Sequence, residues 1–181
     1  MNTLLTITDL LATGENLTFP EVHKKRFAAR AVVTDSEERV ALLYIGKGQF
    51  HKLPGGGVEK GEDLSLALER ELLEEIGCLA EVTGEIGIVE EKRSRISLLQ
   101  TSYCFKAYVV GKKGEPDFTE EEIADGASIV WADSLGAAIS ILESDQPVGW
   151  EGHFIVMRDL AFLKAAGASA LKKKPNELFF E

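Results

Sequence analysis

The sequence has little cysteine, little basic charge and no long hydrophobic run. Only two of its 181 residues are cysteine, and their spacing matches no metal-binding motif. No apolar stretch approaches the roughly 18 residues that a membrane span needs, and the N-terminal residues lack the features of a secretory signal. We therefore expect a cytoplasmic protein with no membrane span, in which Cys78 and Cys104 are reduced, packed thiols.

Basic residues are outnumbered by acidic ones. The chain has 30 acidic and 20 basic residues, which gives a formal net charge of −10. An extended nucleic-acid surface or a polybasic membrane surface would need a basic face, so we expect neither. An anionic ligand would therefore need a local basic patch or a bound cation.

Apolar patterning predicts strands and helices within one domain. Strands are expected at residues 27–33, 40–45, 50–53, 80–91, 99–110 and 129–131, and helices at 63–76, 134–143 and 151–166. Residues 111–126 are expected to form a polar loop. The fold class predicted is α/β, a sandwich with a mixed sheet and helices on both faces.

The domain boundaries follow from the same patterning. Residues 1–24 form a weakly patterned lead-in that either adds a strand or packs on the surface of the domain, residues 25–165 form the domain, and residues 166–181 form a solvated tail. The last apolar helix either forms the surface of a homodimer or caps the sheet, and the sequence leaves both open.

A glycine-rich run precedes a helix that carries three glutamates on one side. Glu71, Glu74 and Glu75 are spaced i, i+3 and i+4, so their like charges lie close together. A hard divalent cation would offset this repulsion, and the glycines allow backbone atoms to approach the same place. The alternative is an ordinary solvated helix face. Against it, Leu66 and Leu73 place apolar residues on further sides, which predicts a helix sandwiched within the fold.

Residues 56–78 resemble the box that identifies the Nudix hydrolases. Gly56 is followed after five residues by Glu62 and after seven more by Arg70-Glu71, and the run ends in Leu72, Glu74-Glu75, Gly77 and Cys78. Every fixed position matches, and Cys78 is a small hydrophobe where Ile, Leu or Val is usual. The resemblance extends over residues 25–165 and implies the Nudix-type α/β/α sandwich.

The resemblance implies a metal site and a reaction. Nudix enzymes hydrolyse a nucleoside diphosphate linked to another moiety, by attack of water at phosphorus with Mg²⁺ or Mn²⁺. By motif position the metal ligands are Glu71, Glu74 and Glu75 with the carbonyl of Gly56. Arg70 would orient a glutamate by a charge-assisted hydrogen bond. Glu62 would bond within the loop, and the alternative is that it contributes to the metal shell.

The resemblance does not fix the general base. Glu75 is the candidate within the box, and a downstream loop carries an acidic run, residues 120–122, with Glu121 at its centre. The alternative for that run is a solvated turn.

The substrate contacts predicted are Arg30, Lys52 and His51. Arg30 is a charge within an apolar strand, and its alternative is a structural ion pair with a box carboxylate. Lys52 and His51 directly precede the glycines. A weaker basic cluster lies at residues 92–95, and the aromatic residues considered for stacking with a base are Phe50, Tyr103 and Trp131.

The resemblance favours a small nucleotide, with a nucleoside triphosphate preferred, as the substrate. The proline that ADP-ribose enzymes carry about fifteen residues past the box is absent, and so are the markers of dinucleoside polyphosphate and coenzyme A enzymes. The alternative function is a ligand-sensing Nudix-like domain without turnover, although such domains usually have an eroded box.

Overall fold

The computed structural model describes residues 1–171. The strands are β1 (Thr3–Thr8), β2 (Lys24–Thr34), β3 (Val40–Ile45), β4 (Phe50–Lys52), β5 (Gly55–Gly57), β6 (Leu79–Arg93), β7 (Leu98–Val110) and β8 (Ala127–Ala132). The helices are α1 (Asp9–Thr13), α2 (Leu64–Ile76), the 3-10 turn η1 (Ser94–Ile96), α3 (Glu120–Ala124), α4 (Leu135–Ser144) and α5 (Trp150–Leu171).

The strands form one mixed sheet in the order β1-β6-β7-β2-β3-β4, with β5 paired to β2 and β8 paired to β3. The β2–β7 and β1–β6 pairs are parallel, whereas β6–β7 and β3–β8 are antiparallel. The long parallel register of β2 and β7, from Lys24 opposite Leu98 to Thr34 opposite Tyr108, forms the centre of the sheet.

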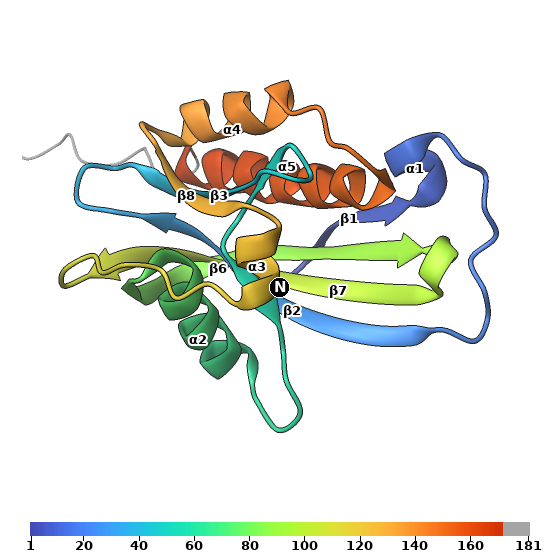
Figure 1. The fold of residues 1–181 in the computed structure, drawn as a ribbon, viewed down its shortest axis with the longest axis horizontal. Helices are drawn as coiled ribbons and strands as arrows, with labels where there is room; N and C mark the ends of the chain where they lie inside the picture. Colours follow the sequence, from blue (N-terminus) through green and yellow to red (C-terminus); the bar gives the residue numbers. More distant parts are fainter. Residues whose placement is uncertain (172–181) are drawn as a thin grey trace, which may run out of the picture.

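Helices cover both faces of this sheet, with α4 and α5 on one side and α2 on the other (Figure 1). Each face has its own apolar core. One core joins α5 residues such as Phe162 to the sheet, and the other joins the buried row of α2, which includes Leu68 and Leu72. This arrangement confirms the predicted α/β fold class with a mixed sheet.

Both cysteines are free and buried in these cores. Cys104 belongs to the core under α5 and Cys78 to the core under α2. Burial raises the pKa of each thiol above its ordinary value, so neither is an activated nucleophile.

The structure settles or corrects the expectations for the following segments. The lead-in forms β1, which pairs with β6 at the edge of the sheet, and the short helix α1. The polar loop contains the short helix α3, capped by a reciprocal Thr119–Glu122 box. Helix α5 continues to Leu171, past the predicted end at residue 166, and the rest of the predicted tail, residues 172–181, lies outside the described residues.

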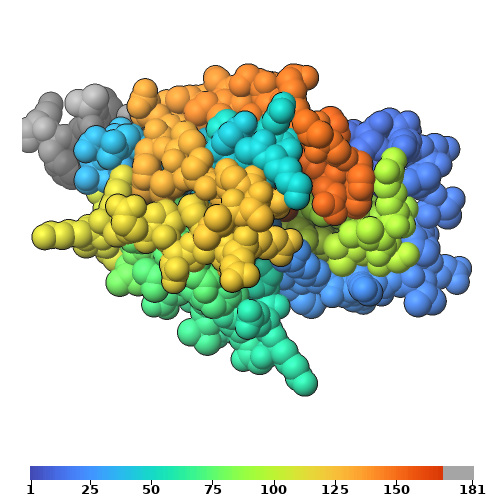
Figure 2. Space-filling view, in the orientation of Figure 1, coloured from blue at the N-terminus to red at the C-terminus, as the bar shows by residue number. Residues whose placement is uncertain are grey.

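The expectation that α2 is sandwiched is wrong. Leu66 is 56% exposed and Leu73 is 51% exposed, so the outer side of this helix faces solvent. The loop that leads into α2 also projects from the body of the molecule, with residues 59–61 exposed (Figure 2). None of the helices within residues 1–171 combines the length and apolar content of a membrane span.

Candidate active site

Two glycines bring the loop before α2 against the sheet and the helix. β5 pairs antiparallel with β2, which places Gly55 opposite Arg30. Gly55 has a φ of 124°, and a Cβ at this position would overlap the backbone of Ala29. A Cβ at Gly56 would overlap the carboxylate of Glu71. The glycine run is therefore needed for close approach of the backbone to both β2 and the first box carboxylate.

Capping and apolar spacing fix the position of α2. Asp63 is its N-cap, and its side chain accepts hydrogen bonds of 2.9 Å from two N–H groups of the first turn. The helix ends at Gly77, which has a φ of 62°. Its inner side is buried in the core, which leaves the carboxylate side toward the glycine loop.

Arg70 joins the carboxylates of the box. Its Nε donates to Glu62 at 3.0 Å, and its Nη1 donates to Glu71 at 2.8 Å and to Glu74 at 3.3 Å. Its Nη2 also donates to the carbonyl of Gly57 at 3.1 Å, which ties the loop to the helix. The bond with Glu62 makes the largest contribution to a raised pKa of Arg70, and the same bond lowers the pKa of Glu62. The guanidinium therefore stays charged and organises the acidic cluster.

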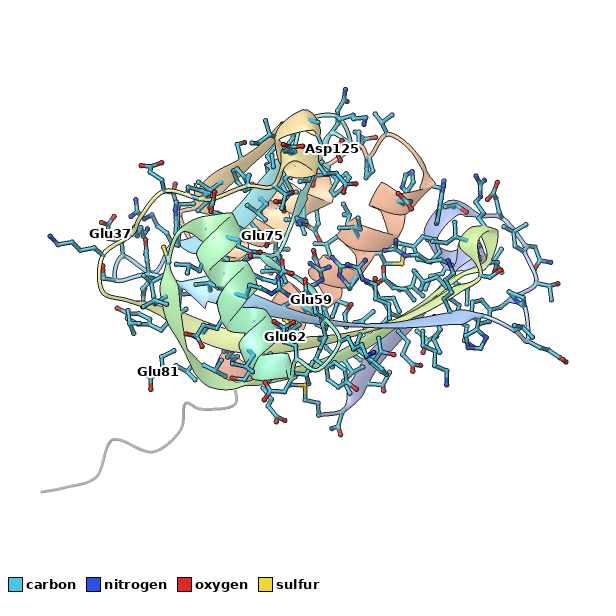
Figure 3. All side chains as sticks on the ribbon, turned by 60° about the horizontal axis from the view of Figure 1, so that its bottom comes forward. Glu37, Glu59, Glu62, Glu75, Glu81 and Asp125 are labelled. Atoms are coloured by element: carbon cyan, nitrogen blue, oxygen red, sulfur yellow. The ribbon has the colours of Figure 1, made fainter. Side chains whose placement is uncertain are left out.

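Glu75 is held separately from the other box glutamates. It is 1% exposed, its Oε1 accepts from Lys52 Nζ at 2.6 Å, and its Oε2 accepts from the Gly55 N–H at 2.5 Å. Burial raises the pKa of this carboxyl, and the ammonium of Lys52 opposes that rise. Figure 3 labels Glu75 on α2, with Glu59 and Glu62 around the loop that precedes the helix.

The residues of the box fit a hard divalent cation. Glu71 and Glu74 both accept from Nη1 of Arg70, so two carboxylates of the box converge on the same side of α2. The Glu71 carboxylate occupies the space that a Cβ of residue 56 would fill. The backbone of Gly56 therefore lies directly beside this carboxylate. Carboxylate and carbonyl oxygens are the donors that Mg²⁺ and Mn²⁺ take. Within residues 1–171, however, no three acidic, histidine or cysteine side chains already surround a single point, since Glu75 is turned to Lys52.

Arg30 lies on β2, beside the glycine loop. It is 6% exposed, and its Nη1 donates to the carbonyl of Gly55 at 2.6 Å and to that of Leu53 at 3.4 Å. Its Nε has no hydrogen-bond partner. Burial lowers the pKa of Arg30 to about 10, which still leaves the side chain charged at neutral pH. The contacts present are thus with loop backbone, and the predicted ion pair with a box carboxylate is not among them.

His51 and Lys52 face different partners. The backbone N–H and Nδ1 of His51 bond to the Asp145 carboxylate at 2.7 and 2.8 Å, and its ring lies 4.9 Å from that of Tyr44. Lys52 bonds to Glu75. Of the predicted substrate residues, Lys52 is therefore the one that the structure joins directly to a box carboxylate.

Glu121 lies on α3 and is exposed. The segment that leads into α3 is anchored on α2, because the N–H of Asp117 donates to the Glu74 carbonyl at 2.7 Å. This anchor ties the segment before the acidic run to the C-terminal end of the box helix. Glu121 itself has no bond to a box side chain among residues 1–171, and its charge acts on Lys47, which follows β3.

The aromatic candidates have different surroundings. Tyr103 lines a surface hollow of about 520 Å³ beside the start of α2, together with Phe27, whose ring lies 6.4 Å away. Phe50 is buried, and the ring of Trp131 is covered by Lys113 Nζ at 3.2 Å. Tyr103 is therefore the one of the three placed to contact a ligand in a hollow.

The basic cluster at residues 92–95 is largely paired within the protein. Arg93 is buried, bonds to Glu91 at 2.9 Å and lies 5.5 Å from the ring of Phe154. Arg95 pairs with Glu15, and that pair is exposed. The cluster thus includes a buried structural cation and a surface ion pair.

The sequence analysis missed a buried polar network that supports the loop from α5. Asp159 is fully buried, accepts from the Leu53 N–H at 2.8 Å and pairs with Arg158 at 2.7 Å. Arg158 also reaches Glu91, which accepts from Gln100. The available signal was an adjacent Arg-Asp pair inside an otherwise apolar helix, because charges are rarely buried unless they are paired.

Comparison with known proteins identifies the same segment. The NUDIX domain family matches residues 24–140. No curated protein matches the chain. Similar solved structures are the E. coli ORF135 protein (18% identity, TM-score 0.59, 85% of this chain and 96% of that one) and a NUDIX hydrolase from Nitrosomonas europaea (21%, 0.59, 81% and 90%). A third is the MutT protein from Methanosarcina mazei Go1 (17%, 0.54, 84% and 98%), and at these identities the likeness concerns the fold.

Proposed function

The chain belongs to the NUDIX family, and from this membership we propose that it hydrolyses a diphosphate linkage in a nucleoside diphosphate derivative with Mg²⁺ or Mn²⁺. The observation that supports the proposal most strongly is the meeting of Glu71 and Glu74 at one nitrogen of Arg70, beside the glycine loop. Like charges are costly to bring together, and a cation-binding role explains why the fold does so.

Each box residue has a proposed role. Glu71, Glu74 and Glu75, with the Gly56 carbonyl, would hold the cation, which supplies positive charge against the diphosphate oxygens and lowers the pKa of water. Arg70 keeps two of these carboxylates in place and bonds to the loop backbone.

The proposed substrate contacts surround the loop. The ammonium of Lys52 lies beside the box and can donate to a phosphate oxygen. Arg30 fixes the carbonyls of Leu53 and Gly55, so its proposed contribution is to position the loop, and a phosphate contact would add to that. His51, the middle residue of β4, is oriented by Asp145 and stays a proposed substrate contact.

The proton of the attacking water needs a carboxylate acceptor. Glu75 is in the box but has both oxygens bonded, whereas Glu121 is exposed on α3. Both remain proposals for the general base, and Gln variants at each position separate them by their pH–rate profiles.

The substrate class is tested with a panel of compounds. We expect the wild-type protein to release phosphate or pyrophosphate from at least one nucleoside triphosphate, including oxidised deoxynucleotides, and to stop when EDTA removes the metal. ADP-ribose, nucleotide sugars, dinucleoside polyphosphates and capped RNA complete the panel. Absence of turnover on every compound with both Mg²⁺ and Mn²⁺ would contradict the proposal and favour a ligand-sensing domain.

A further inference from the structure

Lys52, which lies outside the box, forms an ion pair with Glu75. The Nζ to Oε1 distance is 2.6 Å, and the other carboxylate oxygen accepts from the Gly55 N–H. The side chain of Glu75 is 2% exposed and that of Lys52 is 17% exposed, so water screens this ion pair little. Both oxygens of Glu75 are therefore already engaged.

The other two box glutamates have a different partner. Glu71 and Glu74 bond to Arg70, whose position within residues 56–78 belongs to the box itself. Lys52 lies on β4, 23 residues before Glu75 in the sequence. Two separate cations thus pair with the three carboxylates, and Lys52 is the one bonded to Glu75.

We propose that Lys52 is an internal counter-cation that competes with the divalent metal ion for Glu75 and thereby weakens metal binding in the substrate-free protein. The proposal rests on the proposed function, because it takes Glu75 as a ligand. An ammonium and a metal ion on the same buried carboxylate repel each other, so one must leave before the other binds fully. The flexible stem of lysine allows its head group to move away, and an anionic phosphate offers it a new partner.

The test is Mn²⁺ affinity in the absence of any nucleotide, followed by the EPR signal of free Mn²⁺. Lys52→Met removes the competing charge, and we expect its dissociation constant for Mn²⁺ to fall by at least about tenfold. Lys52→Arg keeps a cation beside Glu75, so we expect an affinity within about twofold of the wild type.

A matched control removes a lysine charge elsewhere. Lys164 pairs with Glu143 at 2.7 Å on the surface between α4 and α5, and its side chain is 56% exposed. Lys164→Met changes the net charge by the same amount, so we expect it to leave the Mn²⁺ affinity unchanged. If Lys52→Met does not fold, Lys52→Gln carries the same test, because its amide donates to Glu75 without a positive charge.

The outcomes separate this proposal from the proposed function. Tighter Mn²⁺ binding in the Met or Gln variant, with the Arg variant unchanged, supports competition by Lys52. Unchanged or weaker binding in those variants overturns it, even if the wild type hydrolyses nucleotides. Tighter binding without hydrolysis of any panel compound would contradict the proposed function while supporting the role of Lys52.

Discussion

Arg70 carries one positive charge and bonds to three carboxylates and one carbonyl. Its partners are Glu62, Glu71, Glu74 and Gly57, at 2.8 to 3.3 Å. An ordinary surface ion pair contributes little to stability, but a guanidinium with several partners in fixed positions is a network. The side chain of Arg70 is 28% exposed. Its main contribution is therefore to hold the carboxylates in place, more than the Coulomb energy of any one ion pair.

At the scale of a single residue, we expect Asp35 to make the free energy of unfolding depend on pH. Its buried carboxylate accepts from Lys113, from Arg39 and from two backbone N–H groups. Burial raises the pKa of Asp35, but these bonds outweigh it and hold the pKa well below its usual range. The folded protein therefore keeps the charge at a pH where the unfolded chain takes up a proton, and this stability is lost as pH falls.

We expect Asp35→Asn to lower the free energy of unfolding by about 2 to 3 kcal/mol near neutral pH, and by progressively less below about pH 4. Urea unfolding of both proteins across this range measures the difference. Asp125→Asn is the control, because its partner Lys47 has a side chain that is 76% exposed and the pair is worth under about 1 kcal/mol. A difference that does not change with pH would contradict the assigned cause.

At the scale of elements, apolar patterning predicted those helices and strands that depend on residues close together in the sequence. Strand β3 spans residues 40–45 as predicted, and α2 spans residues 64–76 where a helix was predicted over 63–76. The sequence left open whether residues 1–24 add a strand, because β1 is a mostly exposed edge strand and its partner β6 lies about 85 residues later in the chain. Helix α3 is a single short turn in an acidic run, where local capping by Thr119 decides the structure.

Helix α5 supports the loop through contacts between distant elements, and sequence patterning could not predict these contacts. Asp159 and Leu53 are 106 residues apart, and only the packing of α5 on the sheet brings the carboxylate to the loop N–H. We expect Asp159→Ala to lower the free energy of unfolding by about 3 to 5 kcal/mol, because it leaves the buried Arg158 without its closest partner. Urea unfolding measures this change.

The control for that variant lies on the same helix. Glu151→Ala removes an exposed charge from the first turn of α5, and we expect a change of less than about 0.5 to 1 kcal/mol. An Asp159→Ala protein as stable as the wild type would show that the network does not hold α5 to the loop.

For the whole molecule, the position of the negative charge matters more than its size. Residues 59–91 contain eleven acidic and two basic residues, so nine of the ten excess negative charges lie in that segment. The structure divides this segment among the loop, α2 and β6, so its charges do not all lie on one face: Glu91 of β6 pairs with Arg158 of α5, on the face opposite α2. A protein with this balance can take an anionic substrate at the box if a cation is held there.

The proposed site residues follow from motif spacing, whereas the way their side chains pair does not. Motif spacing brings Glu71, Glu74 and Arg70 together because they share a helix. The pairing of Glu75 with Lys52 depends on how α2 is placed relative to β4, and no local sequence pattern predicts that placement. Likewise, Arg30 was predicted as a substrate contact because it is a charge within an apolar strand, yet in the structure it is buried and donates to the carbonyls of Leu53 and Gly55.

The most direct test of the central claim compares two glutamates of the same helix. Glu74→Gln removes a proposed ligand, whereas Glu69→Gln changes the same charge on the exposed side of α2. With the best substrate from the panel and saturating Mg²⁺, we expect kcat/KM to fall by at least about 100-fold for Glu74→Gln and to stay within about twofold for Glu69→Gln. Equal turnover by wild type and Glu74→Gln would contradict the assignment of the box as the catalytic metal site.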